Sequence, residues 1–280
     1  MKKFLTFVCI VATMLGSTAT FTSCSTDIDG NSTTNNIRRV FPDKLPKSMD
    51  GMIIERNEKG QVVAFKCQKG KNIRNVETNV TLEYKDGLTK NSGQKPDVVV
   101  TEKLLDGRLL NVYNLVLNEK GFVRHCLINE YDRNTNQITG TTTMDFAYNA
   151  DEQLEATQSC ENEREGIVVT ETFIYQDGDI VEKKRHYSNK PKGKTVSKVY
   201  YTSKFSPNPI ENKGGVTCFH DSSDGLEYFY YAGLLGKGTK HLPIMFTDDN
   251  YLLHYKWEFD SDGYPLAAYL KGYLSKSFTW

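Results

Sequence analysis

The chain has 280 residues, of which 38% are hydrophobic, and its 35 Lys and Arg residues equal its 35 Asp and Glu residues in number. This balance excludes a global electrostatic attraction to nucleic acid, because such binding needs clustered positive charge. The 16 tyrosines and 14 phenylalanines suit half-buried strands, whose pleated surface accommodates aromatic side chains.

The first 23 residues have the features of a lipoprotein signal peptide. Two lysines precede an apolar run, FLTFVCIVATMLG, which is too short to span a bilayer as a helix. Small residues then lead to Cys24 in the segment STATFTSCS, which resembles the lipobox where bacterial lipoproteins are cut and lipidated. Phe21 replaces the more usual leucine, and the alternative is an ordinary secretory peptide cut nearby. We expect a signal peptide over residues 1–23 and a lipid on Cys24.

Residues 24–40 are predicted to be a flexible tether, because STDIDGNSTTNN offers almost nothing apolar to bury. Asp27 and Asp29 resemble the acidic surface-export signal of Bacteroidetes lipoproteins. We therefore expect a lipid-anchored protein of the outer membrane at the cell surface, with its periplasmic face as the alternative.

From residue 41 onward the chain repeats an alternating apolar strand, a polar turn and a second alternating strand. Alternation gives each strand one buried and one wet face, and Asp-Gly or Lys-Gly tolerates the positive φ of a tight hairpin. The clearest hairpins are residues 53–65, 82–88, 115–127, 146–156, 173–183 and 257–270. Further expected strands are DVVVTEKLL, GIVVTET, KVYYTSKF, LEYFYYA and YLLHYKWEF.

These patterns predict a single soluble, all-β domain over residues 41–280. Its strands are too many for one flat sheet, so a large antiparallel sheet should curve into a barrel or near-barrel, or split into layers. The terminal YLSKSFTW is similar to the last strand of an outer-membrane barrel. However, charges on both faces of LEYKD and DIVEKKRHY weigh against a lipid-facing band.

The glycine-rich stretch YYAGLLGKGTKHLP raises the question of a phosphate-binding loop. Such a loop needs four residues between its first glycine and Gly-Lys-Ser/Thr. Here only two residues separate Gly233 from Gly236, and Gly238 displaces Thr239. An aromatic strand is expected before it, and Pro243 lies too close for a supporting helix after it. We expect a structural connector.

Other chemical constellations are weak. Cys218, His220 and Asp221 could form half of a metal site or a thiol with its base, but no second pair completes it. DSDG at 260–263 lacks the later ligands of a calcium loop and is better explained as a hairpin turn capped by Asp260. We therefore expect no metal, no cofactor and no catalytic residue.

Four cysteines remain in the body, Cys67, Cys126, Cys160 and Cys218. An even count in an exported protein allows two disulfides, and packing as buried thiols is the alternative. The sequence does not decide between them.

Three blocks, KFSPNPIENKGG (204–215), YYAGLLGKGTKHLP and YKWEFDSDGYP (255–265), resemble a Bacteroidetes lipoprotein family that carries a domain of unknown function with a porin-like fold. The resemblance covers most of the chain after Cys24. It implies an antiparallel, porin-like barrel or partial barrel and implies no activity.

Two functions from different classes follow. The first is a non-enzymatic surface module that binds glycan or another polymer, with stacking aromatics drawn from Tyr200, Tyr201, Tyr228, Tyr230, Tyr231 and Trp257; the same rings are otherwise core residues. The second is a structural or protein-interaction lipoprotein of the outer membrane. A basic segment, Glu182 to Lys198, could touch anionic polysaccharide or lipid headgroups, or be a solvated hairpin. Expected partners are therefore the membrane, through the lipid alone, and a polysaccharide or envelope protein.

Overall fold

The computed structural model describes residues 37–67, 77–85, 96–161, 166–216, 226–248 and 251–280. The chain divides into two compact units, residues 1–30 and residues 31–280. All of the described residues belong to the second unit.

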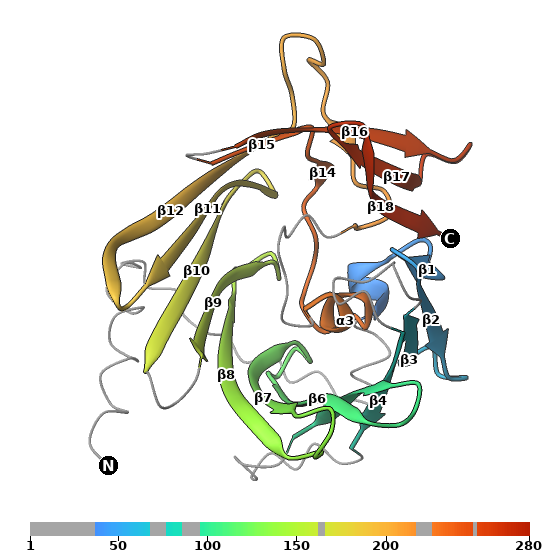
Figure 1. The fold of residues 1–280 in the computed structure, drawn as a ribbon. Coiled ribbons are helices and arrows are strands. Elements are labelled where there is room, and N and C mark those ends of the chain that lie inside the picture. The colour runs from blue at the N-terminus through green and yellow to red at the C-terminus, as the bar shows by residue number, and fades with distance from the viewer. Residues whose placement is uncertain (1–36, 68–76, 86–95, 162–165, 217–225, 249–250) are drawn as a thin grey trace, which may run out of the picture. The chain divides into compact units, whose positions relative to one another are not determined.

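The second unit is a closed antiparallel barrel (Figure 1). From β2 to β12 each strand pairs with the next along the chain, β12 then pairs with β15, and β1 closes the barrel against β18. The order around the barrel is β1-β18-β17-β16-β15-β12-β11-β10-β9-β8-β7-β6-β5-β4-β3-β2, which is sixteen of the described strands. The prediction of an all-β, hairpin-built barrel is confirmed.

The barrel strands are β1 (Ser48–Met49), β2 (Met52–Arg56), β3 (Val62–Cys67), β4 (Thr78–Tyr84), β5 (Val98–Leu104), β6 (Leu109–Leu117), β7 (Val123–Tyr131), β8 (Ile138–Tyr148), β9 (Leu154–Glu161), β10 (Ile167–Gln176), β11 (Asp179–Tyr187), β12 (Lys190–Tyr200), β15 (Met245–Thr247), β16 (Leu252–Phe259), β17 (Pro265–Leu270) and β18 (Tyr273–Thr279). A separate pair joins β13 (Ile210–Glu211) to β14 (His241–Leu242), and the helix is α3 (Leu226–Tyr231).

Alternating side chains set the inner and outer faces of the barrel. In β4, Val80 and Leu82 are buried while Asn79, Thr81 and Glu83 are exposed. In this strand apolar side chains thus point inward and polar ones outward, whereas a strand of a transmembrane barrel presents its apolar side chains outward.

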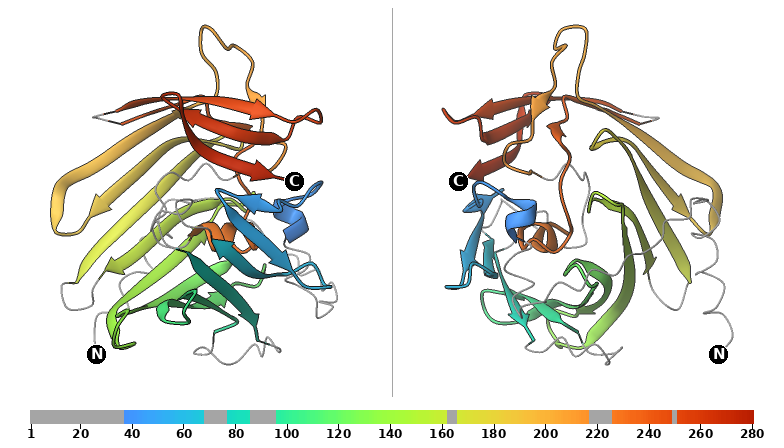
Figure 2. Two further views of the ribbon diagram at one scale, coloured as in Figure 1. Left: turned by 45° about the vertical axis from the view of Figure 1, so that its right-hand side comes forward. Right: turned by 180° about the vertical axis from the view of Figure 1, so that it is seen from behind.

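The chain occupies part of the interior of its own barrel. A barrel of about sixteen strands is too wide for its wall side chains to meet across it. Here α3 and the helical turn at residues 37–40 lie inside the ring of strands (Figures 1 and 2). Their side chains join the wall residues in one hydrophobic core. No helix among the described residues is long and apolar enough to cross a bilayer.

The segment LEYFYYA is a helix, which corrects the expectation of a strand. Five of the six residues of α3 are buried, so its apolar run is surrounded by core, and a short run of this kind does not distinguish a buried helix from a strand. Gly233, at φ 77°, ends the helix. Its N–H donates to Tyr230 O at 2.8 Å and the Leu234 N–H donates to Phe229 O at 2.8 Å, the bonding pattern of a Schellman cap.

Candidate functional site

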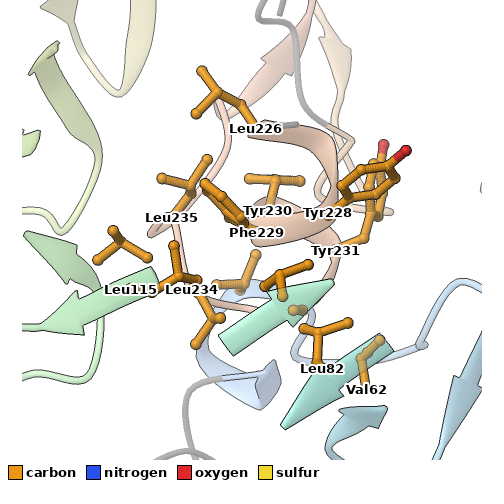
Figure 3. Close-up of a cluster of buried hydrophobic side chains, with 14 of the residues drawn as sticks. Val62, Leu82, Leu115, Leu226, Tyr228, Phe229, Tyr230, Tyr231, Leu234 and Leu235 are labelled. Carbon is orange, nitrogen blue, oxygen red and sulfur yellow. The ribbon is translucent and has the colours of Figure 1, made fainter. Parts of the chain in front are cut away.

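The three tyrosines of α3 lie in the core, not on a surface that a sugar could reach. Tyr228, Tyr230 and Tyr231 are 8%, 1% and 0% exposed, and Figure 3 shows them among buried leucines. The Tyr231 ring stacks on Phe41 with 5.9 Å between centroids. The expected stacking of glycan on these rings is therefore wrong, because the helix turns them into the barrel.

The other expected aromatics do not form one surface either. Trp257 is half-buried and donates its indole N–H to Pro243 O at 2.7 Å. Tyr201 is buried and its hydroxyl donates to Ile180 O at 3.0 Å. Tyr200 is 36% exposed on the other face of its strand. Cys24 lies outside the described residues, as do Cys218, His220 and Asp221.

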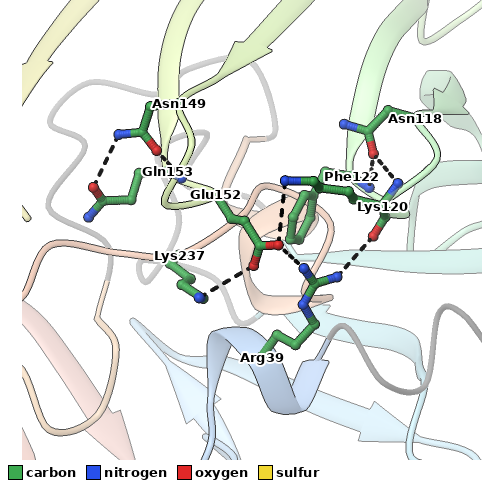
Figure 4. A network of polar contacts seen from close by, with 8 residues as sticks. All are labelled: Arg39, Asn118, Lys120, Phe122, Asn149, Glu152, Gln153 and Lys237. Atoms are coloured by element: carbon green, nitrogen blue, oxygen red, sulfur yellow. Dashed lines mark hydrogen bonds and ion pairs between the residues drawn. The ribbon is translucent and has the colours of Figure 1, made fainter. Parts of the chain in front are cut away.

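The glycine-rich stretch is a connector that attaches the helix to the barrel wall. Its Lys237 N–H donates to Glu152 O at 2.8 Å, and its Lys237 ammonium lies 3.3 Å from the Glu152 carboxylate (Figure 4). Gly236 is needed for this approach, since a Cβ there would lie 2.2 Å from Glu152 O. The Gln153 amide donates to Gly238 O at 3.0 Å. The lysine and backbone amide of this loop thus serve packing, as the sequence suggested.

Glu152 is the centre of a polar network that joins its own turn to three other parts of the chain (Figure 4). Its carboxylate, with a side chain 12% exposed, accepts a hydrogen bond from Arg39 and lies 3.7 Å from the Lys120 ammonium. Arg39 belongs to the helical turn at 37–40 and Lys120 to the β6–β7 turn. The network fixes the segments inside the barrel to its rim.

A second polar cluster, around Glu102, is buried beside α3 and was not anticipated from the sequence. Glu102 is 1% exposed; its carboxylate accepts from Asn111 Nδ2 at 2.7 Å and from the Tyr228 hydroxyl at 3.3 Å. Burial, with the Glu102 charge adding to it, raises the pKa of Tyr228 well above its ordinary value. The cluster holds a neutral phenol against a wall carboxylate and so orients α3.

The basic segment Glu182 to Lys198 is divided between the two faces of the barrel wall. Lys183 is the cross-strand partner of the core residue Phe173. Arg185 is the cross-strand partner of Glu171, which lies two residues from Phe173 and therefore on the same face of β10. Both cations therefore point inward, whereas Lys184 and Lys194 lie on the outer face. A strand periodicity of two residues produces this division.

We call the inward-facing residues of β9–β12 near these cations the polar wall. Its members are Thr157, Ser159, Glu171, Lys183, Arg185, Tyr187, Thr195 and Ser197. Solvent reaches it, because the side chains of Glu171, Lys183 and Arg185 are 18%, 14% and 35% exposed. Elsewhere in the described interior, the same strand positions carry core residues such as Met144 and Phe146.

Contacts within the polar wall orient its charges. The Lys183 ammonium lies 2.9 Å from Glu171 Oε1, and Arg185 Nε lies 3.7 Å from the same oxygen. The Arg185 guanidinium is 5.3 Å from the centroid of the Tyr187 ring, within the range of a cation–π contact. Arg185 Nε is buried and has no hydrogen-bond partner. The wall therefore presents an oriented guanidinium beside hydroxyl groups.

The DSDG turn is a capped hairpin, as expected. Asp260 Oδ1 accepts from the Tyr264 N–H at 2.8 Å and from the Asp262 N–H at 3.0 Å. The first of these bonds is the main reason that the pKa of Asp260 is lowered. Within the described ranges, no group of three or more His, Cys, Asp or Glu residues could hold a metal ion.

The described cysteines do not support a two-disulfide arrangement. Cys67 and Cys160 are free, so two disulfides cannot form among four cysteines. Burial raises the pKa of the Cys67 thiol, whose sulfur lies 4.0 Å from the Tyr228 hydroxyl. Cys67 behaves as a packed core residue.

The closed antiparallel barrel of this chain is a porin-like fold. The chain belongs to the family described as "Domain of unknown function (DUF4595) with porin-like fold", which matches residues 54–270. The search of curated proteins found no match.

Two solved structures share the fold. A porin-like protein from Bacteroides uniformis ATCC 8492 is 18% identical, with a TM-score of 0.56 over 81% of this chain and 89% of that one. A porin-like protein from Bacteroides vulgatus ATCC 8482 is 10% identical, with a TM-score of 0.50 over 85% of this chain and 99% of that one. At these identities the likeness concerns the fold alone.

Proposed function

We propose that the protein is a non-enzymatic binding module of the cell envelope that takes a saccharide chain at the polar wall. It is held in the outer membrane by a lipid on Cys24 and faces the cell surface. The observation that carries the proposal is a set of charged side chains that point into the barrel and remain partly solvent-exposed, beside inward hydroxyl residues of which Thr157, Ser159 and Ser197 are buried. Saccharide sites are concave and combine such polar groups with apolar surroundings.

The inward charges of the polar wall are costly to the fold. Turning Lys183 and Arg185 into a barrel desolvates two cations, and Glu171 supplies one carboxylate in return. Burying charge without full compensation destabilises a fold, and apolar residues at these positions would extend the core. A binding role accounts for the retention of polar groups at this wall.

Affinity electrophoresis tests the proposal. The full-length chain, purified in mild detergent, is run through native gels that contain plant or host polysaccharides, both neutral and acidic. We expect at least one polysaccharide to retard the protein. Thr195→Tyr, which places a ring on the inner face, should abolish retardation, whereas Val196→Tyr on the outer face should leave it unchanged. No retardation by any polymer would overturn the proposal.

A second candidate is docking of another envelope protein, and one observation favours it. Tyr251, Leu252, Tyr273 and Leu274 are 60%, 53%, 80% and 53% exposed and lie at the same end of the β16–β18 segment. Exposed apolar groups of this kind mark interaction sites. Cross-linking in the native envelope, lost on Tyr273→Ser and Leu274→Ser substitution, would support docking; unchanged cross-linking would refute it.

A further inference from the structure

We propose that the polar wall selects an acidic saccharide, and that Arg185 is the residue that binds its carboxylate or sulfate group. This inference rests on the proposed function and adds the chemical class of the ligand. Four strands, β9 to β12, contribute the wall, and their inward residues decide the charge that a ligand would meet.

The first step is the charge balance of the wall. Near these cations, the neighbouring strands β9 and β12 contribute the inward hydroxyl side chains of Thr157, Ser159, Thr195 and Ser197, whereas Leu154 and Val199 of the same strands pack with the hydrophobic core. The charged inward side chains are Glu171, Lys183 and Arg185, which leave one positive charge in excess. Lys190 adds a further cation near the rim, 5.8 Å from the Tyr187 centroid. A ligand at this wall therefore enters a positive field.

The neighbours of Arg185 do not satisfy the hydrogen-bonding capacity of its guanidinium. Glu171 Oε1 lies 2.9 Å from the Lys183 ammonium but 3.7 Å from Arg185 Nε, which is beyond hydrogen-bond distance. Arg185 Nε is a buried donor with no partner. Buried donors are nearly always paired, so the neighbours of Arg185 leave part of the hydrogen-bonding capacity of its guanidinium unused.

The third step is the orientation of the guanidinium. The Tyr187 ring lies near it, with 5.3 Å between the guanidinium carbon and the ring centroid, and a cation–π contact at this distance restrains the position of the cation. A guanidinium presents a planar fork that matches the two oxygens of a carboxylate or sulfate. With its side chain 35% exposed, Arg185 is accessible to a ligand from solvent.

Hydroxyl residues beside the two cations are suited to the uncharged part of an acidic sugar. Ser197 is the cross-strand partner of Lys183, and Thr195 is the partner of Arg185, so hydroxyl groups lie directly beside both cations. Hydroxyls both donate and accept, which suits the hydroxyls of a sugar ring. Charge-assisted bonds to an acidic group are stronger than these neutral bonds, so acidic saccharides should bind more tightly than neutral ones of the same length.

Isothermal titration calorimetry of the full-length chain in mild detergent tests this inference with three probes: an oligogalacturonate tetramer, a heparin-derived sulfated tetrasaccharide and a neutral maltotetraose. We expect an acidic probe to bind at least tenfold more tightly than the neutral one. Arg185→Gln should weaken that binding at least tenfold. Lys194→Gln removes a cation from the outer face of the same wall, on β12. This substitution should change the affinity for the acidic probe less than twofold.

Arg185→Lys separates the charge from the fork and provides a variant that keeps the electrostatics of the fold. We expect it to bind acidic probes more weakly than the native chain and more tightly than Arg185→Gln. Equal weakening by Lys194→Gln would overturn the inference, because it would assign binding to the outer surface. Equal affinity for neutral and acidic probes would overturn it while the proposed function stands. No binding of any probe, together with no retardation in the gels, would overturn both.

Discussion

Replacing Gly236 with alanine tests how the glycine-rich stretch stabilises the barrel. Gly236 has φ 77°, and a Cβ there would lie 2.2 Å from Glu152 O. Gly272 is a matched control, since its φ is 83° and nothing lies within 4 Å of its would-be Cβ. The two substitutions share the backbone strain and differ in the steric clash alone.

The expected magnitude is the sum of three contributions. An L-residue in the left-handed region costs about 1–2 kcal/mol, and this applies to both variants. At Gly236 the clash also separates Lys237 N from Glu152 O, which is a hydrogen bond worth about 1 kcal/mol. Displacement of the loop also breaks the hydrogen bond from the buried Gln153 amide to the Gly238 carbonyl. Leaving that buried amide without this partner costs about 1–3 kcal/mol. We expect Gly236→Ala to lose about 3–6 kcal/mol and Gly272→Ala about 1–2 kcal/mol.

Urea unfolding provides the measurement, with the fluorescence of Trp257 and Trp280 as the probe, since both rings pack against the core. The free energy of unfolding is extrapolated to water for each variant. If Gly236→Ala is no less stable than Gly272→Ala, the loop is able to move away from Glu152, and its close approach does not hold α3 in place.

Three further predictions follow from the polar contacts. Glu152→Gln should lower the free energy of unfolding by about 1–3 kcal/mol, because Arg39 and Lys237 lose a half-buried partner, while Glu155→Gln on the outer face should change it little in the same urea titration. Asp260→Asn should destabilise the chain above about pH 4, because the lowered carboxyl pKa stabilises the fold only while Asp260 is ionised; the difference from the native chain should vanish as the pH falls below that range, and a difference independent of pH would contradict the turn contacts. Tyr228→Phe should reduce the loss of stability that the native chain shows above about pH 10. The raised pKa of Tyr228 stabilises the fold below about pH 10, and this stabilisation disappears as the pH rises further. Circular dichroism between pH 8 and about pH 12 measures the effect, and the same pH profile for both chains would refute it.

Local pattern was sufficient to predict the barrel wall. Strands such as β4 alternate so regularly that the inner face can be assigned from the sequence alone. Hairpin turns such as 260–263 are recognised by their Asp and Gly residues. The contents of the barrel were less predictable. The run LEYFYYA has the composition of a strand and becomes a helix because the barrel surrounds it, which is a tertiary effect that local propensity does not contain.

The candidate site shows a similar limit. Once Phe173 is assigned to the core, the period of two residues places Glu171 on the inner face, and this signal was present in the sequence. Arg185 is different, because its place beside Glu171 depends on the cross-strand register between β10 and β11, and the register shift at Ile174 and Tyr175 cannot be read from either strand alone.

The closure of the barrel has a consequence for the order in which the domain is built. β1 and β18 meet through only two residue pairs, Ser48 with Thr279 and Met49 with Phe278, and Thr279 is the penultimate residue. The helix α3 precedes β16, β17 and β18 in the chain, so the strands that complete the ring are synthesised after the segment they enclose. The ring of strands therefore cannot close before α3, the segment that it encloses, has been synthesised.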